Sequence, residues 1–138
     1  MKNRIFIGEF VGSAFLVMII VGSGIMAQNL TRDFAVMLLA NTLATGAGLF
    51  VLINSIADIS GAHFNPAVTM VMYFTKRIKK DLIFTYLSAQ ILGCLLGVML
   101  ANFMFELPLI ELSKKVRPGF NIFIAELIAT FGLIFIIF

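Results

Sequence analysis

The sequence predicts an all-α membrane protein with about four transmembrane helices and one re-entrant half-helix. Hydrophobic residues make up 61% of the 138-residue chain and charged residues only 12%, whereas soluble domains contain about 45–50% apolar and about 25% charged residues. The apolar residues fall in four long runs and one short run. A core of this size could not bury them all, so lipid is expected to solvate much of the surface.

The four long runs can each cross the roughly 30 Å hydrocarbon layer, which requires about 20 helical residues. They cover residues 5–27, 34–57, 82–105 and 120–138. The first run contains Glu9 and is longer than the apolar core of a signal peptide, about 7–15 residues, so an uncleaved membrane helix is expected. The last run stops at Phe138 without a polar flank, which indicates a truncated product.

The short run, Pro66–Thr75, lies between the second and third spans. A helix of this length rises only about 15 Å, half of the hydrocarbon thickness, and is therefore expected to be re-entrant and shielded by protein. Asn65 suits the N-cap of this half-helix and Pro66 its first position. The free N–H groups and the positive dipole end would point at the membrane centre, an arrangement that admits neutral solutes and disfavours cations and protons.

Positive charges are unevenly distributed between the two sides of the predicted membrane domain. One side would carry six positive residues: Lys2, Arg4, Lys76, Arg77, Lys79 and Lys80. The other side would carry four: Arg32, Lys114, Lys115 and Arg117. The positive-inside rule then places the N-terminus and the connection 76–81 in the cytoplasm. We interpret the cluster 76–80 as a solvated anchor, and a site for lipid headgroups is the second interpretation. No basic stripe on a folded module is visible, so no nucleic-acid partner is expected.

Two segments of the chain resemble each other, which indicates an internal repeat. Residues 6–13 read FIGEFVGS and residues 123–130 read FIAELIAT, so that Glu9 and Glu126 take matching places near the start of a span. An odd number of crossings separates the copies, which predicts an incomplete inverted-topology repeat. The single membrane domain, 1–138, would comprise a first repeat (1–105), an extracellular or periplasmic connection (106–119) and the first helix of a second repeat (120–138).

The most specific segment is SGAHFNPAVT, residues 60–69. It resembles the first Asn-Pro-Ala loop of the major intrinsic protein family, the aquaporins and aquaglyceroporins. The first span, with Gly8, Glu9 and Gly12, resembles the first helix of the family, and residues 86–93 resemble its third. The resemblance covers nearly the whole chain. It implies an aquaporin-like fold and a passive channel for water or small neutral solutes such as glycerol, with no cofactor.

The resemblance also implies roles for individual residues. The pore motif would be Asn65, Pro66 and Ala67, and the pore-lining carbonyl groups would be those of Gly61, Ala62, His63 and Phe64. Glu9 and Glu126 would brace the re-entrant loops. Thr45 stands where the family usually has a large aromatic residue in its outer constriction, which implies a wider or more polar filter. For His63 and Thr45 a packing role is the alternative.

The remaining expectations concern association and location. The second Asn-Pro-Ala loop and the filter arginine would lie beyond Phe138, so conduction would need a missing half from a longer chain or from partner copies. A non-conducting truncated membrane module is the alternative. The family commonly forms tetramers, which implies a homo-oligomer in a bacterial-type inner or plasma membrane. The GxxxG patterns at Gly8 and Gly93 indicate close helix contacts within a subunit. No catalytic residues are identified, and a lone histidine argues against a metal site.

Overall fold

The computed structural model describes residues 1–111 and 119–137, and these ranges contain helices and loops only. Lys114, Lys115, Arg117 and Phe138, which enter the charge count and the last predicted span, lie outside the described residues. The helices are α1 (Lys2–Leu30), α2 (Phe34–Ser60), α3 (Pro66–Phe74), the short 3₁₀ turn η1 (Lys80–Leu82), α4 (Ile83–Met104) and α5 (Phe120–Ile137). Within the described ranges, α1, α2, α5 and the continuous segment of η1 and α4 are long and apolar enough to span a membrane, which confirms the predicted fold class.

The helix ends follow from local sequence. Asp33 precedes α2, and its side chain accepts hydrogen bonds from the backbone N–H groups of Ala35 (2.8 Å) and Val36 (3.3 Å). At the other end of α2, Gly61 adopts a left-handed conformation with φ of +90°, which terminates the helix at little steric cost. Asn65 caps α3 as predicted: its side-chain oxygen accepts from the N–H of Ala67 at 2.8 Å.

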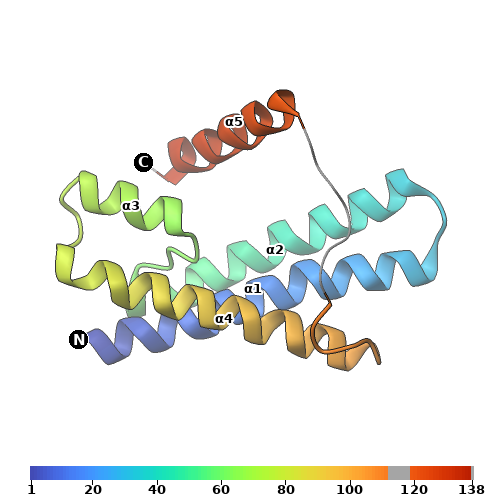
Figure 1. Ribbon diagram of the computed structural model, residues 1–138, viewed down its shortest axis with the longest axis horizontal. Coiled ribbons are helices and arrows are strands. Elements are labelled where there is room, and N and C mark those ends of the chain that lie inside the picture. The colour runs from blue at the N-terminus through green and yellow to red at the C-terminus, as the bar shows by residue number, and fades with distance from the viewer. Residues whose placement is uncertain (112–118, 138) are drawn as a thin grey trace.

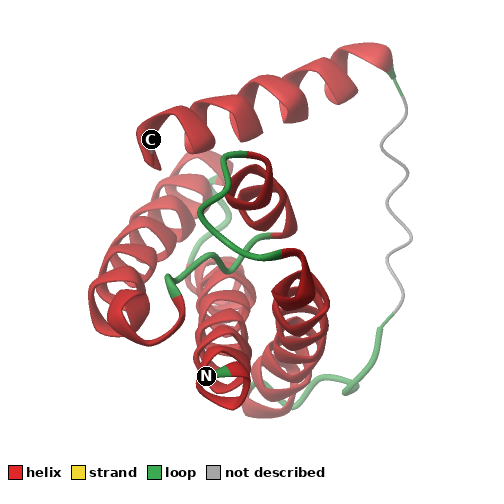
Figure 2. Ribbon diagram, turned by 90° about the vertical axis from the view of Figure 1, so that its left-hand side faces the viewer, coloured by secondary structure: helices red, strands yellow, loops and turns green. Residues whose placement is uncertain are grey.

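Helix α1 is the centre of the bundle and packs between α2 and α4 (Figures 1 and 2). Its contact with α4 is close because Gly93 and Gly97 lie directly against the backbone carbonyl groups of Phe10 and Ala14. A Cβ atom at either glycine would overlap with a backbone atom of α1. The small residues therefore mark helix contacts inside the chain, as the sequence pattern predicted.

Helix α3 is re-entrant. Figure 1 shows that α2 runs to the end of the bundle where α1 begins, that the following loop turns back toward the middle, and that α3 returns to the same end. There α4 begins and packs against α3. An ion pair between Lys2 Nζ and Asp81 Oδ2 (3.3 Å) joins the N-terminus to the connection before α4. These two segments therefore lie on one side of the bundle, whereas the assignment of that side to the cytoplasm stays a prediction.

Helix α5 lies apart from the α1–α2–α4 bundle and approaches α3 (Figures 1 and 2). None of its described residues is buried. It runs in the opposite direction to α1, so that its C-terminal end lies on the left of Figure 1, the side on which α1 begins. An inverted repeat requires this direction. The boundaries 1–105, 106–119 and 120–138 stay a prediction, and residues 112–118 of the connection lie outside the described ranges.

Candidate pore loop

The loop between α2 and α3 has an unusual backbone. Gly61, Ala62 and Phe64 have positive φ angles of +90°, +51° and +48°. Only glycine adopts such angles readily, and two of these residues carry a Cβ atom. Contacts from the rest of the protein must therefore hold the loop in this conformation.

The buried carboxylate of Glu9 supplies those contacts. Glu9 lies on α1 and is 0% exposed. Its Oε1 atom accepts hydrogen bonds from the Ser60 hydroxyl (2.7 Å) and the His63 N–H (2.9 Å). Its Oε2 atom accepts from the Phe64 N–H (2.8 Å) and the Gln90 side-chain amide (2.8 Å). Four donors thus compensate for the removal of the carboxylate from water, which would be very unfavourable for an unpaired charge in an apolar environment.

A second group of polar side chains supports the loop from behind. Thr69 is 0% exposed, and its hydroxyl donates to the Asn65 carbonyl (3.2 Å) and accepts from the Gln90 amide (3.1 Å). The same hydroxyl lies 3.1 Å from His63 Nδ1. Which of these two atoms donates depends on the tautomer of His63.

His63 is packed rather than open to the loop's free side. Its ring is 7% exposed and stacks on the ring of Tyr86, with 4.3 Å between centroids and 15° between planes. The Tyr86 hydroxyl donates to the Ser60 carbonyl at the end of α2. The structure therefore packs the His63 ring against Tyr86. The pore and the packing interpretations of His63 both stay predictions.

The direction of the loop carbonyls follows from the N–H bonds to Glu9. In a trans peptide the C=O points away from the N–H of the next residue, and the described residues contain no cis peptide. The N–H groups of His63 and Phe64 face Glu9, so the carbonyls of Ala62 and His63 face the opposite way. No hydrogen bond between described residues ends on the carbonyls of residues 61–64. They are open acceptors.

A cavity of about 90 Å³ lies beside this loop. Ala62, His63, Phe64 and Asn65 contribute to its wall. The remaining lining is apolar and comes from Leu16, Leu49, Ile53, Val68, Leu133 and Ile137. Since the side-chain oxygen of Asn65 caps α3, its amide nitrogen is free to donate, and it has no acceptor among the described residues. The cavity thus brings an amide donor next to the segment that carries the open acceptors.

Thr45 lies on α2, one helical turn before the cavity-lining residue Leu49. Residues four apart share a helix face, so Thr45 continues the lining stripe toward the start of α2. Its hydroxyl oxygen is buried and has no hydrogen-bond partner within the described chain. This position is compatible with both the filter and the packing interpretation, and the filter role stays a prediction.

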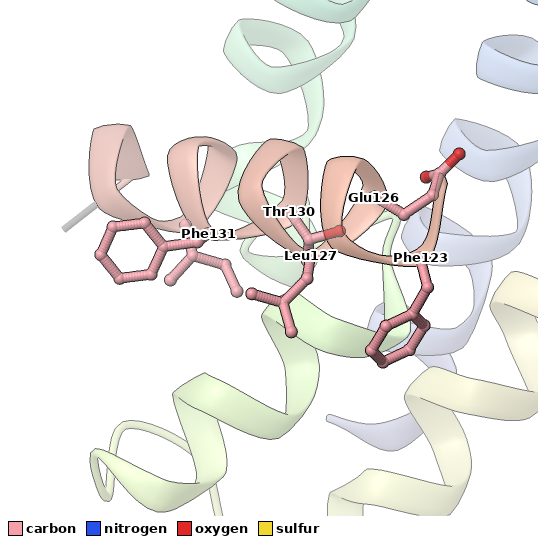
Figure 3. A pocket seen from close by; sticks show the side chains of 6 residues that line it. Phe123, Glu126, Leu127, Thr130 and Phe131 are labelled. Carbon is pink, nitrogen blue, oxygen red and sulfur yellow. The ribbon is translucent and has the colours of Figure 1, made fainter. Parts of the chain in front are cut away.

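Glu126 differs from Glu9 in its exposure and in its hydrogen bonds. It is exposed on α5, beside a shallow hollow of about 420 Å³. Figure 3 shows its carboxylate pointing away from Leu127 and Phe131, which line the same hollow. No loop within the described ranges donates to it. Its role as a brace stays a prediction.

Four residues of the network were not assigned a role by the sequence: Ser60, Thr69, Tyr86 and Gln90. Ser60 and Thr69 are the first and last letters of the specific segment at 60–69, which was the available signal. Gln90, a polar residue inside an apolar span, hydrogen-bonds across helices to Glu9. Among the described residues no group of His, Cys, Asp or Glu side chains could hold a metal ion.

Apolar helices long enough to span a membrane, together with a re-entrant half-helix, define a helical integral membrane protein. Comparison with known families agrees. The model of the major intrinsic protein family matches residues 1–138. The chain belongs to the major intrinsic protein family, whose members are channels.

Individual relatives support the same assignment. The chain is 45% identical to aquaglyceroporin AqpS of Rhizobium meliloti (strain 1021), over 93% of this chain and 55% of that protein. It is 35% identical to aquaporin NIP3-1 of Arabidopsis thaliana, over 95% of this chain and 43% of that protein. The crystal structure of the aquaglyceroporin from Plasmodium falciparum superimposes with a TM-score of 0.62 at 29% identity, covering 77% of this chain and 43% of that one. The chain thus spans about half the length of these relatives.

Proposed function

We propose that the chain forms the first half of a passive channel for water and small neutral solutes, glycerol-like solutes included. One observation carries this proposal: the cavity is lined by the loop residues Ala62, His63 and Phe64, which have open backbone carbonyls, and by Asn65, which has a free side-chain amide. A solute that leaves bulk water there finds both acceptors and a donor. The names of the relatives, which include an aquaglyceroporin and an aquaporin, support the same substrate class.

The mechanism assigns a separate task to each group. The carbonyls of Gly61, Ala62, His63 and Phe64 accept hydrogen bonds from the solute in single file. Asn65, positioned by Pro66 and Ala67 at the start of α3, donates to it at the membrane centre. The positive end of the α3 dipole disfavours cations and protons. Glu9 holds the loop, and no catalytic step or cofactor is involved.

Thr45 is the proposed determinant of solute size. Its side chain is small, and its stripe leads along α2 to Leu49 at the cavity wall. A filter with a small polar residue there would be wide enough for a polyol as well as for water. The proposal therefore expects glycerol to permeate together with water.

A complete pore needs a second half-helix opposite Asn65. The exposed Glu126 beside its hollow on α5 is the proposed brace for that second loop, as Glu9 is for the first. A longer chain or partner copies would supply it, in a homotetramer with one pore per subunit. We place this assembly in an inner or plasma membrane with the N-terminus in the cytoplasm, because the ion-paired N-terminus and connection 76–81 share the more basic side.

The test measures osmotic shrinkage of lipid vesicles by stopped-flow light scattering. One set of vesicles contains the chain, and a second set contains the chain continued by the C-terminal part of AqpS. A sucrose gradient measures water permeability and a glycerol gradient measures glycerol permeability. The complete pore should shrink vesicles faster than empty vesicles do. Leu49→Trp should slow both processes by filling the cavity, whereas Leu43→Trp, on an exposed position of the same helix, should not. Shrinkage equal to that of empty vesicles under both gradients would overturn the proposal.

A second candidate is a non-conducting membrane module. The observation that favours it is the position of α5, whose residues Leu133 and Ile137 close over the cavity from the outside. If the 138-residue chain is stable in vesicles but impermeable, while the continued chain conducts, the chain on its own is a non-conducting module.

Antiparallel pairing of two half-channels would require both orientations in one membrane. Labelling of cysteines introduced at both ends excludes that pairing if only one orientation is found.

A further inference from the structure

The connection between α3 and α4 is a hydrogen-bonded turn that carries four of the chain's ten Lys and Arg residues. The N–H groups of Arg77 and Ile78 both donate to the Met72 carbonyl, at 2.8 and 3.2 Å, and that of Lys76 donates to the Tyr73 carbonyl at 2.9 Å. Ile78 packs against the buried cluster of Ile5, Leu82 and Tyr86. One partly buried isoleucine thus anchors the turn. We refer to the exposed residues Lys76, Arg77, Lys79 and Lys80 as the basic turn.

The lysines of the basic turn lack carboxylate partners. Asp81, the acid nearest in sequence, is engaged by Lys2 at 3.3 Å. The backbone carbonyl of Asp58 accepts from Arg4 (3.1 Å), which adds a further cation to this side. No carboxylate in the described ranges forms an ion pair with Lys76, Lys79 or Lys80. Their charge is therefore not compensated within the described part of the protein.

The basic turn also lies where a membrane surface would be. Phe74, two residues before Lys76, is 70% exposed, and Phe84, two residues after the end of η1, is 81% exposed. Aromatic rings at the ends of membrane spans lie at the level of the lipid headgroups. The lysine side chains between these two rings are within reach of that layer, since long cationic side chains extend along apolar surface toward it.

We propose that the basic turn binds the headgroup of an anionic phospholipid in the adjoining leaflet. A zwitterionic headgroup carries its own ammonium group and so offers no net countercharge, whereas an anionic headgroup neutralises the charges of Lys76, Lys79 and Lys80, for which the described ranges supply no ion-paired carboxylate. This inference requires only that the protein is inserted in a membrane, and does not depend on conduction. It predicts a lipid preference beyond the orienting effect that positive residues exert during insertion.

The experiment is native mass spectrometry of the detergent-solubilised chain with added phosphatidylglycerol or phosphatidylcholine of identical acyl chains. The wild-type chain should retain phosphatidylglycerol in preference, by about fivefold for each lysine that contacts it. The triple variant Lys76→Gln, Lys79→Gln, Lys80→Gln should lose this preference. The triple Lys→Arg variant should keep it. Arg32→Gln, at the opposite end of the bundle, is the matched control and should also keep it.

The alternatives give different results. Equal retention of both lipids by the wild-type chain would show that the basic turn is a topological anchor only, and would overturn the proposal. Displacement of the bound lipid by inorganic phosphate at equal concentration would show a site for soluble anions, and would also overturn it. A loss of preference in Arg32→Gln equal to that in the triple Gln variant would remove the assignment to this turn. Far-UV circular dichroism of each variant checks that the helices are retained.

Discussion

Helices α1 and α5 contain closely similar sequences but place their glutamates in opposite environments. Glu9 is 0% exposed and accepts four hydrogen bonds, whereas Glu126 is exposed and has no donor among the described residues. The difference arises from what packs against each helix. On α1, Gly12 leaves room for the ring of Phe64, so the re-entrant loop reaches the carboxylate. The same sequence pattern therefore gives a buried, bracing carboxylate on α1, where the re-entrant loop supplies donors, and an exposed carboxylate on α5.

The strongest test of this comparison is the paired substitution of the two acids by alanine. Glu9→Ala should lower the free energy of unfolding by about 3–5 kcal/mol, because the buried N–H groups of His63 and Phe64 each lose an acceptor at a cost of about 1–3 kcal/mol. Glu126→Ala should change it by less than about 0.5 kcal/mol, as is usual for exposed positions. The free energy is measured by titration with sodium dodecyl sulfate, followed by far-UV circular dichroism.

Equal effects of the two substitutions would contradict this account. If both were severe, Glu126 would have partners comparable to those of Glu9. If both were mild, the loop would be held by its own sequence rather than by the carboxylate. The variant Glu9→Gln is informative in either case, since its amide oxygen can still accept one backbone N–H.

The next largest effect is expected from glycines with contrasting surroundings. A Cβ atom at Gly97 in α4 would overlap the backbone carbonyl of Ala14, and a backbone atom cannot move away without shifting the helix. Gly97→Ala should therefore destabilise the protein by about 1–3 kcal/mol. Gly132 in α5 has open space around it, so Gly132→Ala should be neutral or stabilising by up to about 1 kcal/mol through helix propensity. The same detergent titration distinguishes a loss from a gain.

Much of the fold could be predicted because membrane insertion depends on long, local features of the sequence. The apolar runs predicted the spans to within a few residues, and Asn65 with Pro66 predicted the start of the half-helix. The small residues at Gly93 and Gly97 predicted a close helix contact. Each of these signals lies within one short stretch of sequence, so the feature that it predicts can be read without knowing the distant contacts.

The polar network was less predictable because it depends on distant partners. Gln90 meets Glu9 across 81 positions of sequence, and no local pattern specifies that pair. The side chain of His63 lies behind the loop because it stacks on Tyr86. Glu126 is exposed and has no hydrogen-bond donor among the described residues, so its role as a brace stays a prediction. Resemblance to a family could identify these residues, but only the three-dimensional arrangement shows which atoms they contact.

A smaller effect should distinguish a buried hydroxyl of the loop support from an unpartnered one. The Tyr86 hydroxyl donates to the Ser60 carbonyl in the interior. Tyr86→Phe should cost about 1 kcal/mol, the usual contribution of one hydrogen bond, while leaving the stacking on His63 in place. The Tyr73 hydroxyl has no hydrogen-bond partner among the described residues, so Tyr73→Phe is the matched control and should be near neutral. A larger loss in Tyr73→Phe than in Tyr86→Phe would contradict this account, because only the hydroxyl is removed and the Tyr73 hydroxyl would then contribute more than the buried one.

The smallest effect is expected from the exposed ion pair between Lys2 at the start of α1 and Asp81 in η1, whose side chains are 55% and 57% exposed. Water and salt screen such a pair, so its coupling energy should be about 0.2–1 kcal/mol at low ionic strength. A double-mutant cycle of Lys2→Ala and Asp81→Asn measures this term. It should fall toward zero in about 1 M salt, where the screening length is about 3 Å. A coupling that persists in high salt would mean that the N-terminus is held more tightly than its exposure implies, and that α1 is fixed at its end as well as at Glu9.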